Sequence, residues 1–555
     1  MRIFTGGAVH TMVPGLTPQE AIAIDGELIV AVGSREEVAA RAPKAERIDL
    51  GGKAIVPGFI DPHHHMCIAV LFAHAAPCGP HDAPTIDEIV KRLQVRAASV
   101  PEGAWVVGYD YDAQSLPGGA HPTREHLDAA CVDKPVLLMH YSHHEAVVNS
   151  RALREAGIDR DTPDPHGGVI VRDRHGNPTG RLIEAAMQRC DHLARESLTT
   201  QHAEDWVRDA IAHQAQLFAT GITRIHDPIV SPALEALYQR ARAEGLKLSV
   251  VLSPLAPGSF MQGDAARLDG PPSGEGSDAS RVGPVKMVLD GAERCAMCLT
   301  LGQIAKSALA TAGRVLTRFS LTPMRSAMGA PFRRGGDGKL HRGLLFYDTE
   351  AAQACVKHAT DRGFDLMLHA IGNEAVDVAL DAIESAPARR RFPPRIEHAT
   401  FTTELHRKRI ADLGIVISTQ ASFLGMPGIS AAPPVSGLAM LPFRSFLDSG
   451  VTLAFSSDHP VTAFDPLHGI RCAVTRKLSD GRIHDRDQRI SVEQAIAGYT
   501  RGAAIATGSL DVCGTLEAGK RADLVVLSED PYAGDALERV RVVETLLAGD
   551  SVYSA

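Results

Sequence analysis

The sequence predicts an α/β protein whose largest part is a (β/α)8 TIM barrel, joined to a small β-sandwich domain built from both termini. Eight short apolar segments recur along the chain, and several are followed by helical patterns such as residues 374–385 and 491–507. Short, nearly continuous apolar strands are typical of parallel sheets that are buried on both faces. Eight such strands favour a closed barrel. An open, doubly wound sheet has the same periodicity and is the structural alternative.

The eight apolar segments share one further property, because each ends in or beside polar residues. In chain order they are 54–61, 221–227, 246–255, 285–291, 364–370, 395–399, 414–420 and 451–458. Active sites of α/β barrels lie at the carboxyl ends of the strands. The polar side chains that close these segments are therefore the first candidates for chemistry.

Both ends of the chain carry a β-rich pattern. Residues 21–33 contain two apolar runs joined at Asp25-Gly26, a dipeptide that favours a tight hairpin turn because both central residues need a positive φ. Residues 514–555 show the same pattern of short apolar runs separated by turns. The predicted domains follow from this pattern: a β-sandwich of residues 1–56 and 510–555, and a barrel of residues 57–509.

The uneven spacing of the segments predicts an insertion after barrel strand 1. The stretch between the first two segments includes residues 161–180, whose turn-rich sequence indicates a hairpin. We therefore expect an inserted subdomain at about 78–200. A second irregular stretch, 257–283, is rich in Gly, Pro, Ser and Asp, which predicts a loop. Long loops near barrel tops often act as lids or binding walls.

Composition excludes several classes of protein. The 57 Lys and Arg against 66 Asp and Glu give a net charge of −9 without a long basic run, which disfavours nucleic-acid and anionic-membrane partners. No apolar run approaches the roughly 18 residues that span a membrane. The first residues lack the pattern of a signal peptide. Nine scattered cysteines do not form a disulfide framework. We expect a cytoplasmic protein.

The first apolar segment ends in DPHHHM, which places Asp61, His63 and His65 at alternating positions. Alternate side chains of an extended chain share a face, so His63 and His65 can point at one ion while His64 points away. The alternative is a polar loop with incidental histidines.

Three later segments also end in candidate ligands, and a fourth contains a lysine. Lys286 interrupts the apolar run VKMVLDG, and a buried ammonium needs either a modification or a partner such as Asp290. His369 and His398 close the fifth and sixth segments, and Asp458 closes the eighth. Taken singly, each histidine could be a hydrogen-bonded core residue, and Asp458 could cap a helix. Together they predict a divalent metal site, because imidazole and carboxylate are ligands of zinc-like ions.

The ordered motifs resemble those of the metal-dependent amidohydrolase superfamily, and within it the N-substituted formamide deformylase-like (YtcJ-type) branch. The resemblance covers nearly the whole chain. The motifs that carry it are PGFIDPHHH, PTREHLDAACVDKPV, HHEAVVNSRAL, PDPHGGVIVRDRHGNPTGRLIE, VKMVLDG, LHAIGNEAVD, RIEHA, SSDHPV and GTLEAGKRADLVVL.

The resemblance implies a ligand set for one or two divalent ions per subunit, with zinc as the expected metal. His63 and His65 would bind the more buried ion, and Lys286, carboxylated on its amine, would bridge the pair. Two further histidines would hold the second ion, namely His369 and His398. Asp458 would bind the first ion. Asn373 stands where the branch more often has an aspartate, which weakens any carboxylate role at that position.

The implied reaction is hydrolysis of a non-peptide C–N bond in an amide or N-substituted formamide. A metal-bridged hydroxide would attack the carbonyl carbon. Asp458 would be the proton shuttle, first as general base and then as general acid. One alternative is the same core acting on N-acyl amino acids, cyclic amides or esters. A catalytically inactive regulatory or binding protein is the alternative of another class, and the presence of Asp458 and the first-strand histidines disfavours it.

Residues of the insertion are the candidates for substrate contact. The resemblance implies that His144 reaches the site and contacts the substrate, with a purely structural role as the alternative. Tyr109 could line the pocket, although packing is the simpler interpretation. Cys295 and Cys298 form a CxxC, and without a second pair we interpret them as two buried thiols. The expected partner is a small-molecule amide; a homodimer fits such barrels, but no interface is legible in the sequence.

Overall fold

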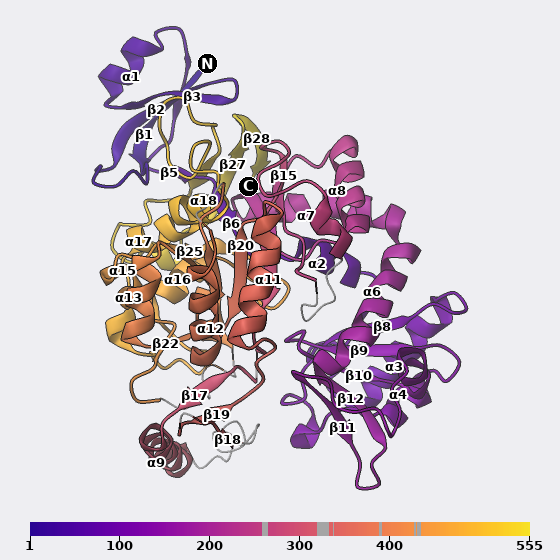
Figure 1. The fold of residues 1–555 in the computed structure, drawn as a ribbon. Coiled ribbons are helices and arrows are strands. Elements are labelled where there is room, and N and C mark those ends of the chain that lie inside the picture. Colours follow the sequence, from indigo (N-terminus) through magenta and orange to yellow (C-terminus); the bar gives the residue numbers. More distant parts are fainter. Residues whose placement is uncertain are drawn as a thin grey trace.

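The computed structural model describes residues 1–257, 265–292, 294–318, 332–336, 338–387, 391–426, 429 and 435–555. It is a mixed α/β structure with four larger sheets (Figure 1). Two of these sheets are parallel and lie at the centre of the molecule. A third joins the two termini, and a fourth lies in the segment inserted between the first two central strands.

Each predicted apolar segment contains one strand of the two parallel sheets. The first sheet consists of β6 (Phe59–Asp61), β13 (Ile222–Asp227), β14 (Ser249–Leu252) and β15 (Ser280–Val282). The second consists of β16 (Val285–Val288), β20 (Leu366–Ala370), β21 (Arg395–His398), β23 (Val416–Thr419) and β25 (Leu453–Phe455). The first predicted segment holds two strands, because β5 (Ala54–Pro57) leaves it to join the terminal sheet.

Single β-bridges lie where the two parallel sheets meet. A parallel bridge joins Leu255, beyond β14, to Lys286 on β16, and another joins His64, beyond β6, to His459, beyond β25. The described strands thus form two ladders, and continuous pairing does not extend around a single closed sheet. Closure into one barrel stays a prediction at this point.

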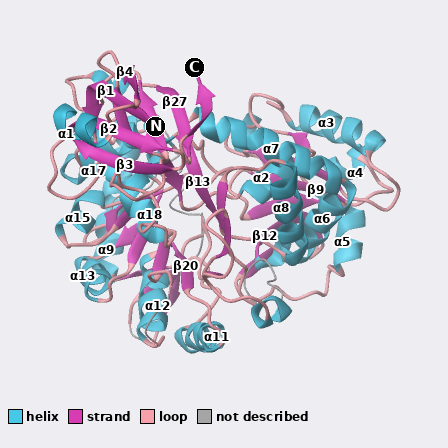
Figure 2. Ribbon diagram, turned by 90° about the horizontal axis from the view of Figure 1, so that it is seen from above, coloured by secondary structure: helices cyan, strands magenta, loops and turns pink. Residues whose placement is uncertain are grey.

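Helices alternate with these strands and cover them (Figure 2). All residues of β13, β16, β20 and β21 are buried, as expected for strands covered on both faces. In the helix after β20 the buried positions include Ala375, Ala379 and Ile383, which share one face. The helices are α2 (Met66–Phe72), α7 (Ala203–Ala219), α8 (Pro232–Glu244), α11 (Thr349–Asp361), α12 (Asn373–Glu384), α13 (Glu404–Asp412), α15 (Phe443–Asp448), α16 (Pro466–Thr475), α17 (Val492–Ala497) and α18 (Ala503–Ala506).

The terminal sheet contains strands from both ends of the chain. Its N-terminal strands are β1 (Arg2–Val9), β2 (Gln19–Asp25), β3 (Leu28–Gly33), β4 (Glu46–Asp49) and β5; its C-terminal strands are β26 (Leu524–Leu527), β27 (Val542–Leu547) and β28 (Asp550–Ser554). β2 and β3 pair antiparallel as the sequence predicts, but Asp25 ends β2 opposite Leu28 and the two turn residues are Gly26 and Glu27, of which only Gly26 has a positive φ. β5 pairs antiparallel with β26 and thereby joins the two ends. The short helix α1 (Arg35–Arg41) follows β3.

The inserted segment forms its own six-stranded sheet with its own apolar core. Its strands are β7 (Ala76–Pro77), β8 (Val106–Tyr111), β9 (Val136–His140), β10 (Glu145–Val148), β11 (Gly168–Arg172) and β12 (Pro178–Glu184); its helices are α3 (Ile86–Ser99), α4 (Arg124–Ala130) and α5 (Ser150–Ala156). The chain returns through α6 (Gln188–Gln201). The predicted hairpin in 161–180 is the antiparallel pair β11 and β12.

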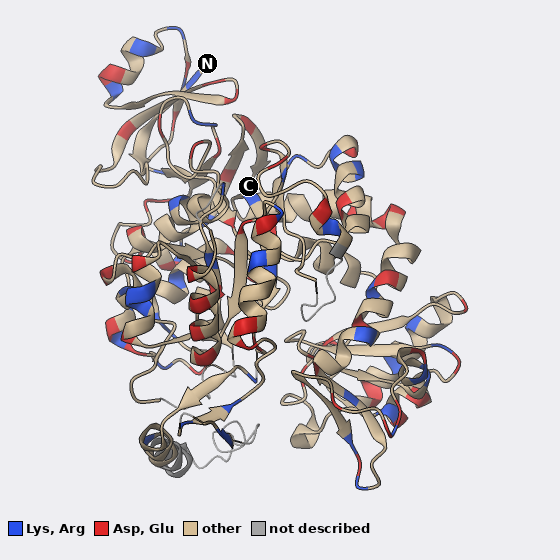
Figure 3. Ribbon diagram, viewed as in Figure 1, with Lys and Arg blue, Asp and Glu red and all other residues tan. Residues whose placement is uncertain are grey.

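Smaller elements extend from the second parallel sheet. They are β17 (Met297–Leu299), α9 (Leu301–Arg318), β18 (Phe332–Arg334), β19 (Leu340–Arg342), β22 (Phe401–Thr402) and β24 (Ala439–Met440). Of the predicted loop 257–283, residues 258–264 lie outside the described residues, and the remainder contains β15. Among the helices that the structure describes, none combines the length and apolar content needed to cross a bilayer. Basic and acidic residues are interspersed along the helices (Figure 3).

Candidate metal centre

The six predicted ligands come from five strands and lie at or near their carboxyl ends. His63 and His65 follow β6, and Lys286 belongs to β16. The other three are His369 on β20, His398 at the end of β21 and Asp458 beyond β25. All six are buried, with relative exposures of 9% or less. Parallel strands place their carboxyl ends at the same edge, which explains how residues so distant in sequence meet.

His63, His65 and Asp458 form the tightest part of the cluster, because one ligand-type atom from each lies within 4.8 Å of the others. Oδ1 of Asp458 is 3.2 Å from Nε2 of His65 and 3.4 Å from Nε2 of His63. The backbone N–H of Asp458 donates to the carbonyl of His63 at 2.8 Å. Burial raises the pKa of the Asp458 carboxyl, but the neighbouring histidines outweigh burial and hold that pKa below its usual range.

Lys286 is buried beside this group. Its Nζ lies 3.2 Å from Nε2 of His63. Burial lowers the pKa of the Lys286 amine to about 8, against the opposing charges of Glu397 and Asp458. The alternative partner, Asp290, instead accepts backbone hydrogen bonds, including one from Ile371 at 2.9 Å.

His369 and His398 lie on the other side of His63. Their ring centroids are 4.5 Å apart, and that of His398 is 5.3 Å from that of His63. Burial lowers the pKa of both imidazoles. Nε2 of His369 is buried and has no hydrogen-bond partner among the described residues, although Oδ1 of Asp290 lies 3.5 Å away. A buried nitrogen in this state is the kind of atom that a metal ion satisfies.

Two of the candidate ligands adopt backbone conformations that side chains seldom take. The φ angle is +57° at Asp458 and +70° at His398. Left-handed conformations at residues other than glycine cost free energy, and they cluster at functional sites. The strand ends are therefore shaped to direct these two side chains into the cluster.

Partners outside the six fix the orientation of two imidazoles. Nδ1 of His63 donates to Oε2 of Glu397 at 2.5 Å, and Nδ1 of His398 donates to Oε1 of Gln420 at 2.8 Å. Each bond leaves Nε2 unprotonated and available as a ligand. Glu397 is itself held by Nε of Arg395 at 2.5 Å. Sequence analysis missed Glu397 and Gln420. The signal for Glu397 was available, because Arg395 and Glu397 alternate in a fully buried strand.

The donor set fits a divalent cation. Burial lowers the pKa of the imidazoles of His63, His369 and His398, and the set adds one ionised carboxylate. Two of its buried ring nitrogens, Nδ1 of His65 and Nε2 of His369, have no hydrogen-bond partner among the described residues. Neutral imidazole and carboxylate are the ligands preferred by zinc-like ions. These His and Asp groups indicate that the protein binds a divalent metal.

The two predicted substrate contacts behave differently. His144 approaches the cluster, with its ring centroid 5.8 Å from that of His369. Its Nδ1 pairs with Oε2 of Glu184 at 2.7 Å; burial alone would lower the pKa of His144, but the charge of Glu184 raises it. Tyr109 is half-buried and stacks on Phe72, with centroids 5.9 Å apart. This stacking is a packing contact and gives no evidence that Tyr109 points toward the cluster.

Two further predictions concern residues beside the cluster. Neither Cys295 nor Cys298 forms a disulfide with a described residue, and both are only partly buried, which corrects the expectation of two buried thiols. Burial still raises the pKa of Cys295 to about 12, so it is a thiol at neutral pH. Asn373 binds the backbone of Cys298 through both ends of its amide. Its role in the described structure is to hold this loop.

Comparison with known proteins agrees with these observations. A model of the amidohydrolase family matches residues 46–553, and one of the imidazolonepropionase-like composite domain of bacteria matches residues 21–45. The chain is 30% identical to an N-substituted formamide deformylase of Arthrobacter pascens, over 96% of this chain and 94% of that one. It is 28% identical to the putative amidohydrolase YtcJ of Bacillus subtilis (strain 168), over 99% of each.

A solved structure with the same fold is that of an uncharacterized metal-dependent hydrolase from Pyrococcus horikoshii OT3. Its TM-score is 0.68 at 23% identity, over 96% of this chain and 98% of that one. The resemblance seen in the sequence motifs is thus confirmed over nearly the full length. The chain belongs to the amidohydrolase family and is a hydrolase that acts on carbon–nitrogen bonds.

Proposed function

We propose that this protein is a metal-dependent hydrolase that cleaves a non-peptide C–N bond in a small amide, with N-substituted formamides as the first choice of substrate. The observation that carries the proposal is the convergence of His63, His65 and Asp458 within 4.8 Å. The similarity to an N-substituted formamide deformylase along nearly the whole chain supports the substrate class.

The proposed metal centre holds one or two zinc-like ions. His63, His65 and Asp458 would bind one ion. A second would lie between the remaining pair of histidines, His369 and His398. Lys286 would bridge the two as a carbamate formed by addition of CO2 to its amine with loss of a proton. Carboxylation would replace a cation by an anion, which removes the repulsion between an ammonium group and adjacent metal ions.

The proposed chemistry divides between the ions and the chain. When bound, the ions would polarise the substrate carbonyl and lower the pKa of water from about 15.7 toward neutrality. Asp458 would accept the proton of the attacking water and deliver it to the leaving nitrogen. Its carboxylate suits the first step because its neighbours keep it ionised. His144, oriented by Glu184, would contact the substrate beside His369.

A buried arginine that contacts Glu397, the partner of His63, bears on the substrate. A free arginine would favour a substrate that carries a carboxylate, such as an N-acyl amino acid. The guanidinium of Arg395 is instead bound by Glu397 and by the carbonyls of Pro62 and Ala506. This engagement favours an uncharged amide. Cyclic amides and esters are the remaining alternatives.

The experiment that tests the function is a hydrolysis screen with zinc-reconstituted protein. The panel contains N-substituted formamides, N-acyl amino acids, lactams and esters, each with a chromogenic or mass-spectrometric readout. We expect formamides to give the highest kcat/KM. A higher value for any other class would replace the proposed substrate, and no turnover of any member would contradict the proposed activity.

The wider organisation is part of the same proposal. The two parallel sheets would be the halves of one (β/α)8 barrel, closed at the seams by the single bridges at Lys286 and His459. The terminal sheet would be the predicted β-sandwich domain of 1–56 and 510–555, and the insertion would span about 78–200. We propose that the protein is cytoplasmic, which cell fractionation tests. We also propose that it is a homodimer, which light scattering tests.

A further inference from the structure

Three histidines outside the proposed centre form a second cluster. His64 lies between the two first-strand ligands but faces away from them, His459 follows Asp458, and His213 belongs to α7. One ring nitrogen from each lies within 4.8 Å of the others. The proposed hydrolysis uses none of these side chains. Helices α2 and α7 pack together in this part of the molecule (Figure 1).

Hydrogen bonds set the tautomers of two of the three rings. Nδ1 of His64 donates to Oδ2 of Asp61 at 3.1 Å. That carboxylate is held in turn by the hydroxyl and the backbone N–H of Ser457, at 2.5 and 3.0 Å. Nδ1 of His459 donates to the carbonyl of Thr462 at 3.3 Å. In both rings Nε2 is therefore left with its lone pair, as in metal-binding histidines whose other nitrogen donates to a carboxylate or a carbonyl.

The spacing of two of the three nitrogens suits cation ligands. Nε2 of His64 is 3.1 Å from Nε2 of His213. Zinc–nitrogen bonds of 2.0–2.1 Å at tetrahedral angles put two ligand nitrogens roughly 3.3 Å apart. The ring of Phe464 packs against all three imidazoles, at centroid distances of 4.8 to 5.6 Å. An apolar ring beside a polar cluster limits the access of water to it.

We propose that His64, His213 and His459 bind a further divalent cation of zinc-like character, separate from the hydrolytic centre. The three imidazole nitrogens supply the protein ligands, and a water molecule takes the fourth position, because His213 and His459 are only partly buried. Without an ion, two of the three rings are joined by a hydrogen bond, in which Nε2–H of His213 donates to Nε2 of His64.

The ion would act by positioning. It would connect helix α7 to the two loops that carry the proposed ligands, one ending in His65 and the other, after β25, containing Asp458. These loops are already joined by the backbone N–H of His65, which donates to the carbonyl of His459 at 2.9 Å. A cation across the three rings would hold both loops against the helix.

Metal counting tests the proposal. Chelator-treated protein is dialysed against buffered free Zn2+, and bound zinc is measured by plasma mass spectrometry. We expect His213→Ala to bind one equivalent less than the wild type, while the control His192→Ala, an exposed histidine on α6, binds the wild-type amount. Equal counts in the wild type and His213→Ala would overturn the proposal.

Two further measurements keep the test decisive if His213→Ala fails to fold. His213→Gln keeps a hydrogen-bonding side chain but is a poor zinc ligand, and we expect the same loss of one equivalent. Anomalous diffraction at the zinc edge from wild-type crystals should show a peak within about 2.1 Å of the three ring nitrogens. Its absence in a crystal that shows zinc at His63 and His65 would overturn this inference and leave the proposed function intact.

Discussion

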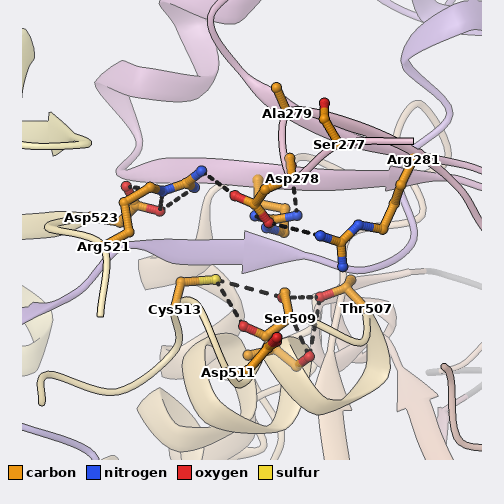
Figure 4. A network of polar contacts seen from close by, with 12 residues as sticks. Ser277, Asp278, Ala279, Arg281, Thr507, Ser509, Asp511, Cys513, Arg521 and Asp523 are labelled. Atoms are coloured by element: carbon orange, nitrogen blue, oxygen red, sulfur yellow. Dashed lines mark hydrogen bonds and ion pairs between the residues drawn. The ribbon is translucent and has the colours of Figure 1, made fainter. Parts of the chain in front are cut away.

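Two polar clusters lie near opposite ends of strands in the two parallel sheets, and they are built in different ways. The metal-centre cluster, at the carboxyl ends, contains histidine nitrogens that no described residue hydrogen-bonds and a lysine beside the imidazole of His63. The cluster around Asp278, near the amino ends, pairs its charges (Figure 4). Oδ1 of Asp278 accepts from Arg224 at 2.6 Å and from Arg281 at 3.1 Å. Arg521 contacts both Asp278 and Asp523.

The difference separates function from stability. Near the amino ends of the strands, the opposite charges pair with one another. Through Arg521, these ion pairs connect the terminal sheet to β13 and β15. At the carboxyl ends of the strands, buried histidine nitrogens of the metal-centre cluster lack hydrogen-bond partners among the described residues. Such atoms cost stability unless a ligand binds them. In barrels the carboxyl ends carry catalysis and the opposite ends carry stability. Substitutions in the two clusters should therefore have opposite signatures.

The largest effect is expected at the first-strand histidines. The double substitution His63→Ala with His65→Ala removes two ligands of one proposed ion, so we expect the hydrolytic centre to lose its metal and turnover to fall to the buffer background. Atomic emission and the hydrolysis assay measure the two quantities. A double variant that still binds the full wild-type complement of metal would show that the ligand assignment is wrong.

Asp458→Asn should remove activity with little loss of stability. We expect kcat to fall by about 10²–10⁴-fold because proton transfer fails. The thermal transition should stay within a few degrees of the wild type, because Asn has nearly the same size as Asp and also tolerates the left-handed conformation found at this position. Asp448→Asn, at an exposed position on α15, is the matched control and should behave as wild type. Near-wild-type kcat in Asp458→Asn would exclude the proposed proton shuttle.

Asp278→Asn should give the reverse signature. Removing the carboxylate leaves Arg224, which is fully buried, without its charged partner. We expect a loss of about 2–3 kcal/mol in the stability of the unit that contains it. Differential scanning calorimetry would show a lower first transition, with kcat/KM of the folded enzyme unchanged at 25 °C. Asp550→Asn on β28, which is exposed, is the control. A large loss of kcat without a thermal shift would break the contrast between the two clusters.

The smallest effect is the pH dependence of that stabilisation. Burial raises the pKa of Asp278, but the charges of Arg224 and Arg521 outweigh it and hold the pKa below its ordinary value. A carboxyl with a lowered pKa stabilises the folded state above its unfolded pKa, which is about 3.9, and loses that contribution as the pH falls further. The thermal difference between wild type and Asp278→Asn should therefore be full at pH 6 and shrink below about pH 4. A constant difference across that range would contradict the assignment.

The sequence predicts the strand ends well because each parallel strand is a short apolar run closed by a polar residue. That local pattern located His369, His398 and Asp458 without any knowledge of pairing. The residues that orient them were missed because their partners are set by strand order. Gln420 reaches His398 only because β23 lies beside β21.

Two other features were beyond local patterns. His213 lies on a helix whose sequence is ordinary, and its meeting with His64 and His459 depends on how α7 packs. The division of the first segment into β5 and β6 depends on β26, which is near the other end of the chain. Tertiary pairing over such distances leaves no periodic trace in a single sequence.

The pairing of β5 with β26 also has a consequence for biosynthesis. Pro57 lies opposite Leu524, so β5 cannot pair with β26 until the chain has been synthesised past Leu527. At ordinary translation rates that delay is on the order of a minute. Throughout it, one edge of β5 is exposed, and exposed strand edges pair readily with other nascent chains. Chaperone occupancy during this interval should therefore concentrate on the first sixty residues.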